Sequence, residues 1–444
     1  MLSDDEGAPG LDVVGPGGAA ANIALCQLET VHLPHAFLVG TTGLQSDSEY
    51  TLRVTAPGRP QVEARARTLP GALLPGQKLN IALGSCFSLA QDKGILASAY
   101  PPSPFGVSRD PIHLRLLVGD QIYMDLDPAT GSPTIFSTPN PWERYSRQWR
   151  TPSFSQFISA SPNVVMGDDH EFWNDYPHGD VWLPWAIAGD AAVADFDPAF
   201  SVFQAALNVD PAMVPAVAAN PGALAALLQD QARTFELRTS PVPIFVLDTR
   251  TRRTRYDADA PRFTEPGWLT RAVNWLGHLA SPAVLVVSQP LVEKAANWIV
   301  RATHTMGDVN LPDYQGDFAT LWNAVLEAPH DVLILSGDIH WNRLYRVSAA
   351  TRPDRSIFEL IASPLARIKQ GSDAKDVQNP TGKVEWANGS AGWLRLFAEN
   401  GKTTYITATF TAAMPVAVDV SLWGPPMSTT VGSIPLAQAS FKLY

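Results

Sequence analysis

The feature that most constrains this chain is an apolar run that ends in a short polar motif, because the pattern occurs four times. The runs are 79–85, 113–118, 163–168 and 331–336, and the polar residues at or beyond their ends are Cys86, Asp120, Tyr123, Asp169, His170, Glu171, Asp338 and His340. Buried strands with such ends place polar groups at the carboxyl edge of a sheet, where open α/β folds bind ligands. If the four strands lie side by side, we expect a metal cluster at that edge.

Composition bounds both the interior and the kind of partner. The chain has 444 residues, of which 45% are hydrophobic, so it suits one large catalytic domain with a smaller module and excludes global disorder. It has 32 Lys and Arg against 43 Asp and Glu, a formal charge of -11. We expect no nucleic-acid partner, because phosphate backbones attract Lys and Arg. Small phosphate-bearing substrates stay open, since bound cations reverse the local field of an acidic pocket.

Cysteine usage and the apolar runs bound the compartment. Only Cys26 and Cys86 occur, which excludes a disulfide scaffold but leaves a single bridge between them open. Residues 1–7 lack the basic start and apolar core of a secretory signal. No apolar run reaches the roughly 18 residues of a spanning helix, so we expect no membrane span. The expected compartment is the cytoplasm, or the exterior if a leader has been removed.

Pattern changes along the chain predict three parts. Residues 1–20 are rich in Gly, Asp, Pro and Ala and predict a flexible lead. Residues 21–72 hold short alternating strands and predict a small all-β module, in which Gly43 and Tyr50 resemble the loop and tyrosine corner of immunoglobulin-like or fibronectin-type sandwiches. Residues 73–444 predict the catalytic domain, with an antiparallel meander formed by 393–397, 405–410 and 416–423. Helices are predicted at 142–149, 268–279 and 318–326, with several short ones between 191 and 236.

The chemistry expected at the sheet edge is that of a two-metal hydrolase, which needs a bridging acid and terminal ligands for each ion. Asp120 is the best bridging candidate, because it follows a glycine at a strand end, where backbone bulk would otherwise crowd an ion. The terminal candidates are Asp169, Asp338 and His340, and the further anionic donors are Tyr123 and Cys86. Thiolate with phenolate favours an ion such as iron, whereas carboxylates alone suit calcium at a neighbouring position.

Five ordered motifs resemble those of the PhoD-like (alkaline phosphatase D) family of metallophosphatases. They are Gly84-Ser-Cys86, Gly119-Asp-Gln-Ile-Tyr-Met-Asp125, Asp168-Asp-His-Glu171, Leu247-Asp-Thr-Arg250 and Ser336-Gly-Asp-Ile-His340. The resemblance covers about residues 79–365, and the small β module also matches the family's amino-terminal sandwich. It implies an α/β fold, a metallophosphatase-type β-sandwich flanked by helices with a small immunoglobulin/fibronectin-like module. It also implies iron and calcium, and phosphomonoesters or phosphodiesters as substrates, either small molecules or a phosphate-bearing polymer.

The same resemblance assigns roles to individual residues. The implied metal ligands are Cys86, Asp120, Tyr123, Asp169, Asp338 and His340. His170 resembles the catalytic histidine that stabilises the transition state or protonates the leaving oxygen, and Arg250, with Arg253, resembles the arginines that hold phosphate. Asn174 and Trp341 are further candidates for substrate contact. The expected mechanism is attack of a metal-bound hydroxide on phosphorus.

The chain also departs from the family pattern, which leaves alternatives open. Ser288 and Gln289 stand where many metallophosphatases have a histidine, so one coordination position is unassigned, and 308–317 matches the family's substrate segment only loosely. One alternative is a non-catalytic binding protein on a metallophosphatase scaffold. Another is a two-metal nuclease, which the net acidity disfavours. The aromatics after the Asp-Asp-His-Glu motif either pack behind the metal ligands or form a wall that shields the phosphate, and they are Phe172, Trp173 and Tyr176.

Overall fold

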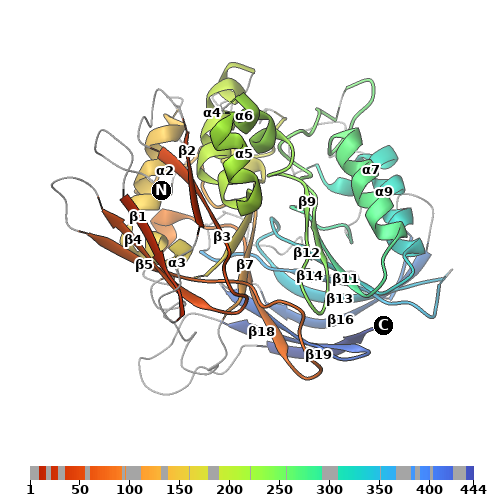
Figure 1. Cartoon of the computed structure of the whole chain (residues 1–444). Coiled ribbons are helices and arrows are strands. Elements are labelled where there is room, and N and C mark those ends of the chain that lie inside the picture. The colour runs from red at the N-terminus through yellow and green to blue at the C-terminus, as the bar shows by residue number, and fades with distance from the viewer. Residues whose placement is uncertain are drawn as a thin grey trace.

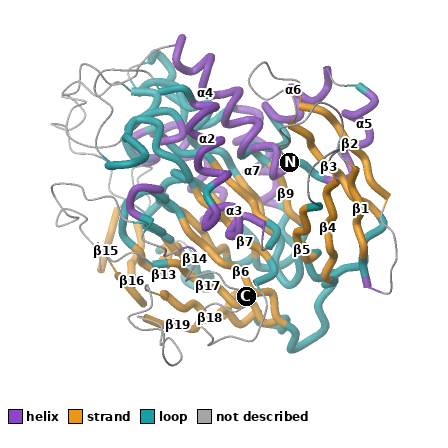
Figure 2. The backbone as a smooth tube through the Cα atoms, turned by 90° about the vertical axis from the view of Figure 1, so that its left-hand side faces the viewer, coloured by secondary structure: helices purple, strands orange, loops and turns teal. Residues whose placement is uncertain are grey.

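Two β-sheets packed face to face form the centre of the molecule, and helices cover their outer faces (Figure 1). The computed structural model describes residues 10–16, 22–28, 36–55, 61–92, 96, 112–131, 139–159, 161–178, 190–220, 222–256, 258–292, 309–350, 352–366, 382–385, 391–400, 404–423 and 437–444. In Figure 2 the strands of both sheets lie in the middle, with α2, α3 and α7 around them. The predicted two-layered β core flanked by helices is therefore confirmed.

The first sheet has six strands in the order β19-β18-β17-β6-β7-β8. Its strands are β6 (Lys78–Gly84), β7 (Leu114–Val118), β8 (Asn163–Met166), β17 (Tyr405–Thr411), β18 (Val416–Trp423) and β19 (Ala437–Leu443). β6, β7 and β8 are parallel, whereas β17, β18 and β19 form an antiparallel meander that joins the sheet through β6. The carboxyl ends of β6, β7 and β8 therefore open at one edge.

The second sheet has eight strands in the order β15-β16-β13-β14-β12-β11-β10-β9. Its strands are β9 (Phe235–Leu237), β10 (Ile244–Val246), β11 (Ala283–Val286), β12 (Val332–Ser336), β13 (Asn342–Ala349), β14 (Ile357–Ile361), β15 (Gly382–Glu385) and β16 (Ala391–Asn400). β10, β11, β12 and β14 are parallel, and the remaining pairs are antiparallel. The loops after β10, β11 and β12 therefore share an edge as well.

One apolar core fills the space between the two sheets. Leu83 and Leu116 of the first sheet pack in the same cluster as Val286 and Leu335 of the second. The outer face of the second sheet is covered by α7 (Pro266–Gly277) and α9 (Gln315–Glu327), and that of the first by α3 (Pro152–Ser159). β7, β10, β11 and β12 are buried along their whole length, which explains why these strands are continuous apolar runs in the sequence.

The predicted helices are present. The run 142–149 lies in α2 (Pro141–Arg150), which begins where the Asn140 side chain accepts hydrogen bonds from the N–H groups of Trp142 and Glu143. The proline-interrupted stretch forms α4 (Asp190–Phe203), α5 (Val214–Ala219) and α6 (Gly222–Gln229). Short 3₁₀ helices span Leu89–Gln91, Asp169–Glu171, Ala205–Asn208, Pro211–Met213 and Leu311–Asp313. No single described helix is long and apolar enough to cross a membrane, and Val193–Asn208 with Pro211–Ala219 meets that test only as a pair bent by 108°.

The observed strand pairing differs from one condition and one prediction drawn from the sequence. The four strands with polar ends do not lie in one sheet, because β12 belongs to the second sheet and β6, β7 and β8 to the first. The predicted carboxyl-terminal meander is also divided, since 393–397 lies in β16 of the second sheet. The chain crosses between sheets after β16, because β17 pairs with β6 in the register Ile406↔Leu83. Pairing between strands this far apart in the chain leaves no mark in the local pattern.

The amino-terminal strands form two small sheets. β1 (Gly10–Val14), β4 (Glu49–Thr55) and β5 (Val62–Arg67) form one, and β2 (Asn22–Leu28) with β3 (Ala36–Thr42) the other. The predicted flexible lead is wrong for 10–14, since β1 pairs along its length with β4 and buries Val13. The Tyr50 hydroxyl accepts a hydrogen bond of 2.7 Å from the Gln45 N–H, the contact expected of a tyrosine corner. The immunoglobulin-like arrangement itself stays a prediction.

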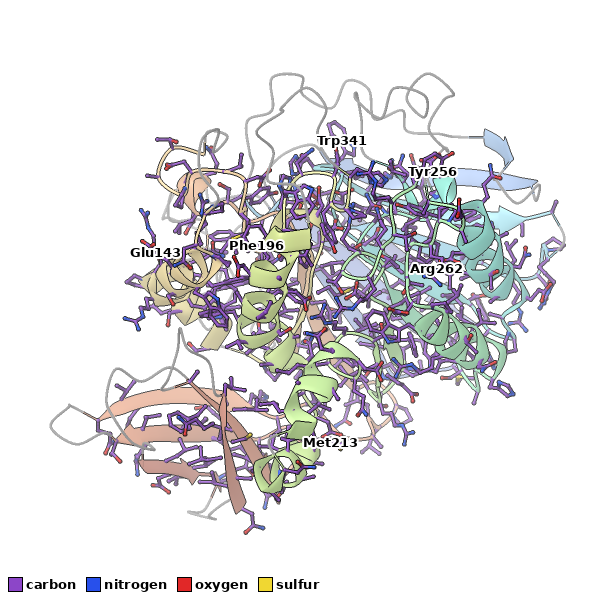
Figure 3. The ribbon with its side chains drawn as sticks, turned by 90° about the horizontal axis from the view of Figure 1, so that it is seen from above. Glu143, Phe196, Met213, Tyr256, Arg262 and Trp341 are labelled. Atoms are coloured by element: carbon purple, nitrogen blue, oxygen red, sulfur yellow. The ribbon has the colours of Figure 1, made fainter. Side chains whose placement is uncertain are left out.

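The β2–β3 hairpin packs against α5 and α6. Cys26 and Leu28 lie in one apolar cluster with Val214 and Val217 of α5. Figure 3 shows these strands beside the segment that carries Met213. Cys26 and Cys86 are both buried and are not joined to each other, so the bridge that the sequence leaves open is not formed.

Candidate metal centre

The loops that follow β6, β7, β8 and β12 bring the predicted ligands together at the edge of the two sheets where these strands end. The Cys86 Sγ lies 3.4 Å from Asp120 Oδ2, and the Tyr123 hydroxyl lies 3.4 Å from the same oxygen. The Tyr123 hydroxyl is also 3.3 Å from His340 Nε2. Convergence at a shared edge, predicted for four adjacent strands, is thus achieved by two sheets that face each other.

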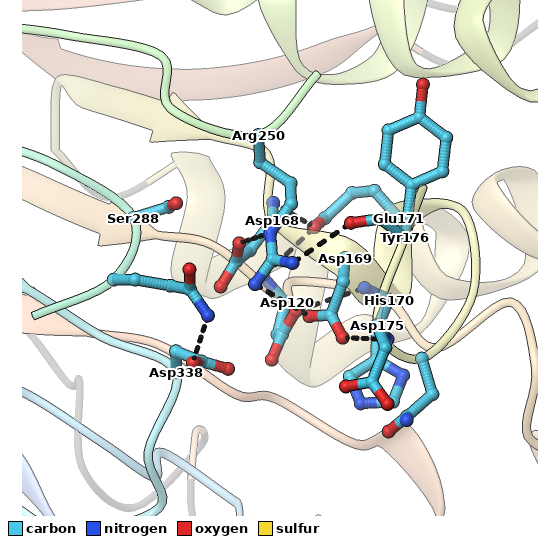
Figure 4. A network of polar contacts seen from close by, with 12 residues as sticks. Asp120, Asp168, Asp169, His170, Glu171, Asp175, Tyr176, Arg250, Ser288 and Asp338 are labelled. Carbon is cyan, nitrogen blue, oxygen red and sulfur yellow. Dashed lines mark hydrogen bonds and ion pairs between the residues drawn. The ribbon is translucent and has the colours of Figure 1, made fainter. Parts of the chain in front are cut away.

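Asp120 is shared by three groups of potential metal ligands. In each group the ligand atoms lie within 4.8 Å of one another, and the groups are Cys86 with Asp120 and His340, Asp120 with Asp169 and His170, and Asp120 with Asp168, Asp169 and Asp338. Figure 4 shows Asp120 and Asp169 directed toward each other. The first group offers sulfur and imidazole, whereas the last offers only oxygen. The donor chemistry therefore fits two different cations that share Asp120.

The backbone is in the left-handed region at four of the six predicted ligands. The φ angles are 56° at Cys86, 54° at Asp120, 70° at Asp338 and 51° at His340. This region is costly for a residue with a Cβ, and such residues concentrate at functional sites. The turns hold each other in place, since the Phe87 N–H donates to the Asp120 carbonyl at 2.8 Å.

Two glycines allow these turns to approach. Gly119 has a φ of 81°, and a Cβ there would lie 2.5 Å from the Cβ of Asp168. At Gly337 a Cβ would lie 2.4 Å from the Val118 carbonyl oxygen. Both distances are far below van der Waals contact, so any larger residue would separate the loops. The crowding that Gly119 relieves therefore comes from the neighbouring acidic loop.

The buried Glu171 carboxylate connects the loops after β7 and β8 by hydrogen bonds to the backbone of both. It accepts hydrogen bonds from the N–H groups of Asp120 at 3.0 Å, Gln121 at 2.7 Å and Asp168 at 2.7 Å, and from Gln204 Nε2 at 3.0 Å. Burial raises the pKa of Glu171 to about 7 in spite of these bonds. The sequence placed Glu171 in a motif without a role, and the structure shows that it positions both acidic turns.

The electrostatics of the centre favour a bound cation. Burial, together with Cys86 and Asp169, raises the pKa of Asp120 well above its ordinary value. Burial and the nearby Asp338 raise the pKa of Cys86 to about 12. Both shifts mean that the charged forms are poorly stabilised by the protein alone. A cation at this position would reverse the balance, because it stabilises thiolate and carboxylate directly.

His170 is held by Asp125, an acid whose motif position carries no assigned role. Its Nδ1 lies 2.8 Å from Asp125 Oδ1, and Asp125 Oδ2 accepts from the Asn174 N–H at 3.3 Å. Burial opposes protonation of the imidazole, but Asp125 and Asp169 outweigh it and raise the pKa of His170 to about 10. The one available signal was that Asp125 closes the motif that contains Asp120 and Tyr123.

The two predicted phosphate-binding arginines are engaged by the protein. The Arg250 side chain is fully buried, its Nε is hydrogen-bonded to Asp168, and its Nη1 donates to the Tyr176 carbonyl at 3.0 Å. Arg253 donates to the carbonyls of Thr249 and Val309 and to Gln289 Oε1. A buried guanidinium needs such partners. Arg250 Nη2 also lies 4.0 Å from Asp169 Oδ1. Phosphate binding by either arginine stays a prediction.

The remaining candidates divide between contacts that are shown and those that stay predictions. Asn174 reaches the site through its backbone N–H, and Trp341 is half-buried beside His340 (Figure 3); substrate contact by either stays a prediction. Phe172, Trp173 and Tyr176 are buried in one aromatic cluster, with Phe172 and Tyr176 stacked at 4.2 Å, so they pack behind the site.

The segments that departed from the family pattern are also placed. Gln289 Nε2 donates to Asp338 Oδ2 at 2.9 Å, and the hydroxyls of Ser288 and Thr249 are 2.8 Å apart. Of the loosely matching segment, Asp308 lies outside the described residues. Asp313 accepts from the Asn310 N–H and Asp317 from the Phe263 N–H. Asp313 therefore closes a local turn, whereas Asp317 joins α9 to a segment 54 residues away.

Comparison with known proteins yields a shared fold. No known sequence family and no curated protein matches the chain. A solved structure described as "Structure of PhoD" matches with a TM-score of 0.64 and 14% identity, over 99% of this chain and 84% of that one. A purple acid phosphatase from yellow lupin (Lupinus luteus) seeds gives a TM-score of 0.49 and 12% identity, over 96% and 69%. The resemblance to PhoD predicted from the motifs is confirmed at the level of the fold.

Proposed function

We propose that this chain, which shares the PhoD fold, is a metal-dependent hydrolase of phosphate esters. The metal ligands in this proposal are Cys86, Asp120, Tyr123, Asp169, Asp338 and His340. The observation that carries it is the position of Asp120, whose carboxylate belongs to all three groups of closely spaced ligand atoms. A bridging acid in this position is what a two-metal hydrolase needs.

The donor types support iron and calcium as the two metals. Thiolate, phenolate and imidazole meet at Cys86, Tyr123 and His340, a set that suits iron. The neighbouring group consists of carboxylates alone, which suit a hard ion such as calcium.

Residues of this chain would supply the proton and the alignment. Cations bound here would activate water and neutralise charge on the phosphoryl group. Because Asp125 occupies Nδ1 of His170, Nε2 is the nitrogen left to give a proton to the leaving oxygen. Arg250 keeps Asp168 in place through their buried ion pair, so it acts as a positioning residue. The proposal covers phosphomonoesters and phosphodiesters, because both release an oxygen that His170 can protonate.

The test is metal analysis of the purified full-length protein together with turnover of chromogenic phosphate monoesters and diesters. We expect at least two metal ions per chain and hydrolysis of at least one ester class. Asp120→Asn should lose metal and turnover together. Bound metal without turnover of either class would support the alternative, a non-catalytic binding protein on this scaffold.

A further inference from the structure

Arg253 and Gln289, from two separate loops, form a hydrogen-bonded chain that ends at Asp338, one of the proposed acidic ligands. Arg253 Nη2 donates to Gln289 Oε1 at 2.6 Å, and Gln289 Nε2 donates to Asp338 Oδ2 at 2.9 Å. The exposed fractions are 4% for Arg253 and 1% for Gln289. Gln289, which stands where many metallophosphatases have a histidine, therefore reaches the candidate centre as a hydrogen-bond donor to Asp338.

The orientation of the Gln289 amide is determined by chemistry. Arginine has donors and no acceptor, so the amide oxygen must face Arg253 and the amide NH₂ must face Asp338. Arg253 is itself fixed, because its Nε donates to the Thr249 carbonyl at 3.0 Å and its Nη1 to the Val309 carbonyl at 3.2 Å. Its guanidinium also lies 5.3 Å from the ring centre of Tyr314. The amide consequently has no alternative orientation that keeps both bonds.

We propose that Gln289, locked by Arg253, is a positioning residue that holds Oδ2 of Asp338 and directs Oδ1 toward the cation. The inference rests on the proposed function and deepens it, since it states how one ligand acts. A carboxylate held by one oxygen binds a metal through the other, and the strained backbone at Asp338, with a φ of 70°, restricts its freedom further. Arg253 thus acts on the candidate metal centre through Gln289.

The test uses full-length protein and measures how fast bound metal is lost to a chelator, by elemental analysis of timed samples. The variants are Gln289→Leu, Gln289→Glu, Arg253→Met and the double variant Arg253→Met/Gln289→Leu. Gln229→Leu is the matched control, because Gln229 Nε2 makes the same kind of bond, 2.8 Å long, to Asp197 away from the metal centre. Thermal unfolding of every variant identifies any that fail to fold.

We expect Gln289→Leu to lose metal about 10- to 100-fold faster than the parent protein, the usual effect of removing a partner of a ligand. Gln289→Glu keeps the shape and the Arg253 contact but cannot donate to Asp338, so it should lose metal as fast. The double variant should equal Gln289→Leu, because both changes break one link. Gln229→Leu should retain metal like the parent.

Three results would overturn the inference. They are parent-like metal retention in Gln289→Glu, parent-like retention in Gln289→Leu, and effects of the Arg253 and Gln289 changes that add in the double variant. If the parent binds metal and hydrolyses esters while these results hold, the link alone is wrong. If the parent binds no metal, the proposed function fails and the inference with it.

Discussion

Buried carboxylates occur in two regions of this molecule, at Asp197 and at the candidate metal centre, and the two regions differ in how the negative charge is balanced. Asp197 accepts hydrogen bonds from Arg233 at 2.7 Å, from Arg252 at 3.4 Å and from Gln229 at 2.8 Å. Burial opposes ionisation of Asp197, but Arg233 and Arg252 outweigh it and lower its pKa. The protein therefore neutralises this carboxylate with its own cations, and we interpret the group as structural.

The candidate metal centre has the opposite balance. Four aspartates, a buried glutamate and a cysteine meet there, and Arg250 is ion-paired with Asp168 among them. The pKa of Asp120 is accordingly raised, where that of Asp197 is lowered. The comparison teaches that burial of acids is not by itself evidence for a metal. What matters is whether the surrounding residues supply the compensating charge.

The largest expected effect comes from Asp120→Asn. Removing a hydrogen-bond partner of a metal ligand lowers metal affinity or activity by about 10- to 100-fold. Loss of the bridging ligand itself should therefore lower kcat/KM by about 10³-fold or more. In metal-free protein the melting temperature should stay the same or rise, since the change removes a buried carboxylate that lies among other acids. Chromogenic ester assays and calorimetry check both. A clearly lower melting temperature of metal-free Asp120→Asn would contradict the contrast between Asp120 and Asp197.

Asp197→Asn should have the opposite profile. Breaking the buried pair with Arg233 should lower the free energy of unfolding by about 3 kcal/mol, with metal content unchanged. Because the folded pKa of Asp197 is lowered, its contribution is fully present above the ordinary value of 3.8. That contribution is lost as the pH falls through the folded pKa. The difference in the free energy of unfolding between parent and variant should therefore become smaller in acid. Denaturant unfolding from neutral pH downward measures this, and a constant gap would argue against the ion pair.

Asp125→Asn tests the residue that holds His170. We expect kcat to fall about 10-fold, because the variant supports the protonated imidazole less well. Metal content should hold, since Asp125 belongs to none of the close ligand groups. Esters with poor leaving groups should lose more rate than those with good ones. Equal losses for both kinds of ester would rule out proton donation by His170.

Tyr123→Phe should give the smallest change in rate. Tyr123 adds a phenol oxygen 3.4 Å from Asp120. Cys86, Asp120 and His340 would still bind the same cation without it, because their ligand atoms form a close group of their own. We expect a few-fold fall in activity and loss of any visible absorption that arises from phenolate bound to iron. An unchanged visible spectrum in the variant would remove Tyr123 from the ligand set.

Several candidate metal ligands could be identified from the sequence because their signal is local. Cys86, Asp120 and His340 each follow an apolar run, and a buried parallel strand requires such a run. The structure places all three where their ligand atoms meet. These local patterns identify the residues even though β12 lies in a different sheet from β6, β7 and β8.

What the sequence could not predict depends on contacts between distant segments. The assignment of β12 and β16 to the second sheet follows from pairing that no local pattern encodes. The roles of Arg253 and Gln289 depend on a hydrogen bond across 36 residues and another across 49. The family resemblance implies that Arg250 holds phosphate, which stays a prediction, whereas its burial beside Asp168 is visible only in three dimensions.

The most direct test of the central claim is a crystal structure of the full-length protein grown with phosphate, with anomalous scattering measured to identify bound elements. We expect an iron ion contacting Cys86 and His340, a second ion contacting Asp169 and Asp338, and Asp120 between them. Ordered side chains at these positions with no cation among them, in protein that still hydrolyses phosphate esters, would contradict the account.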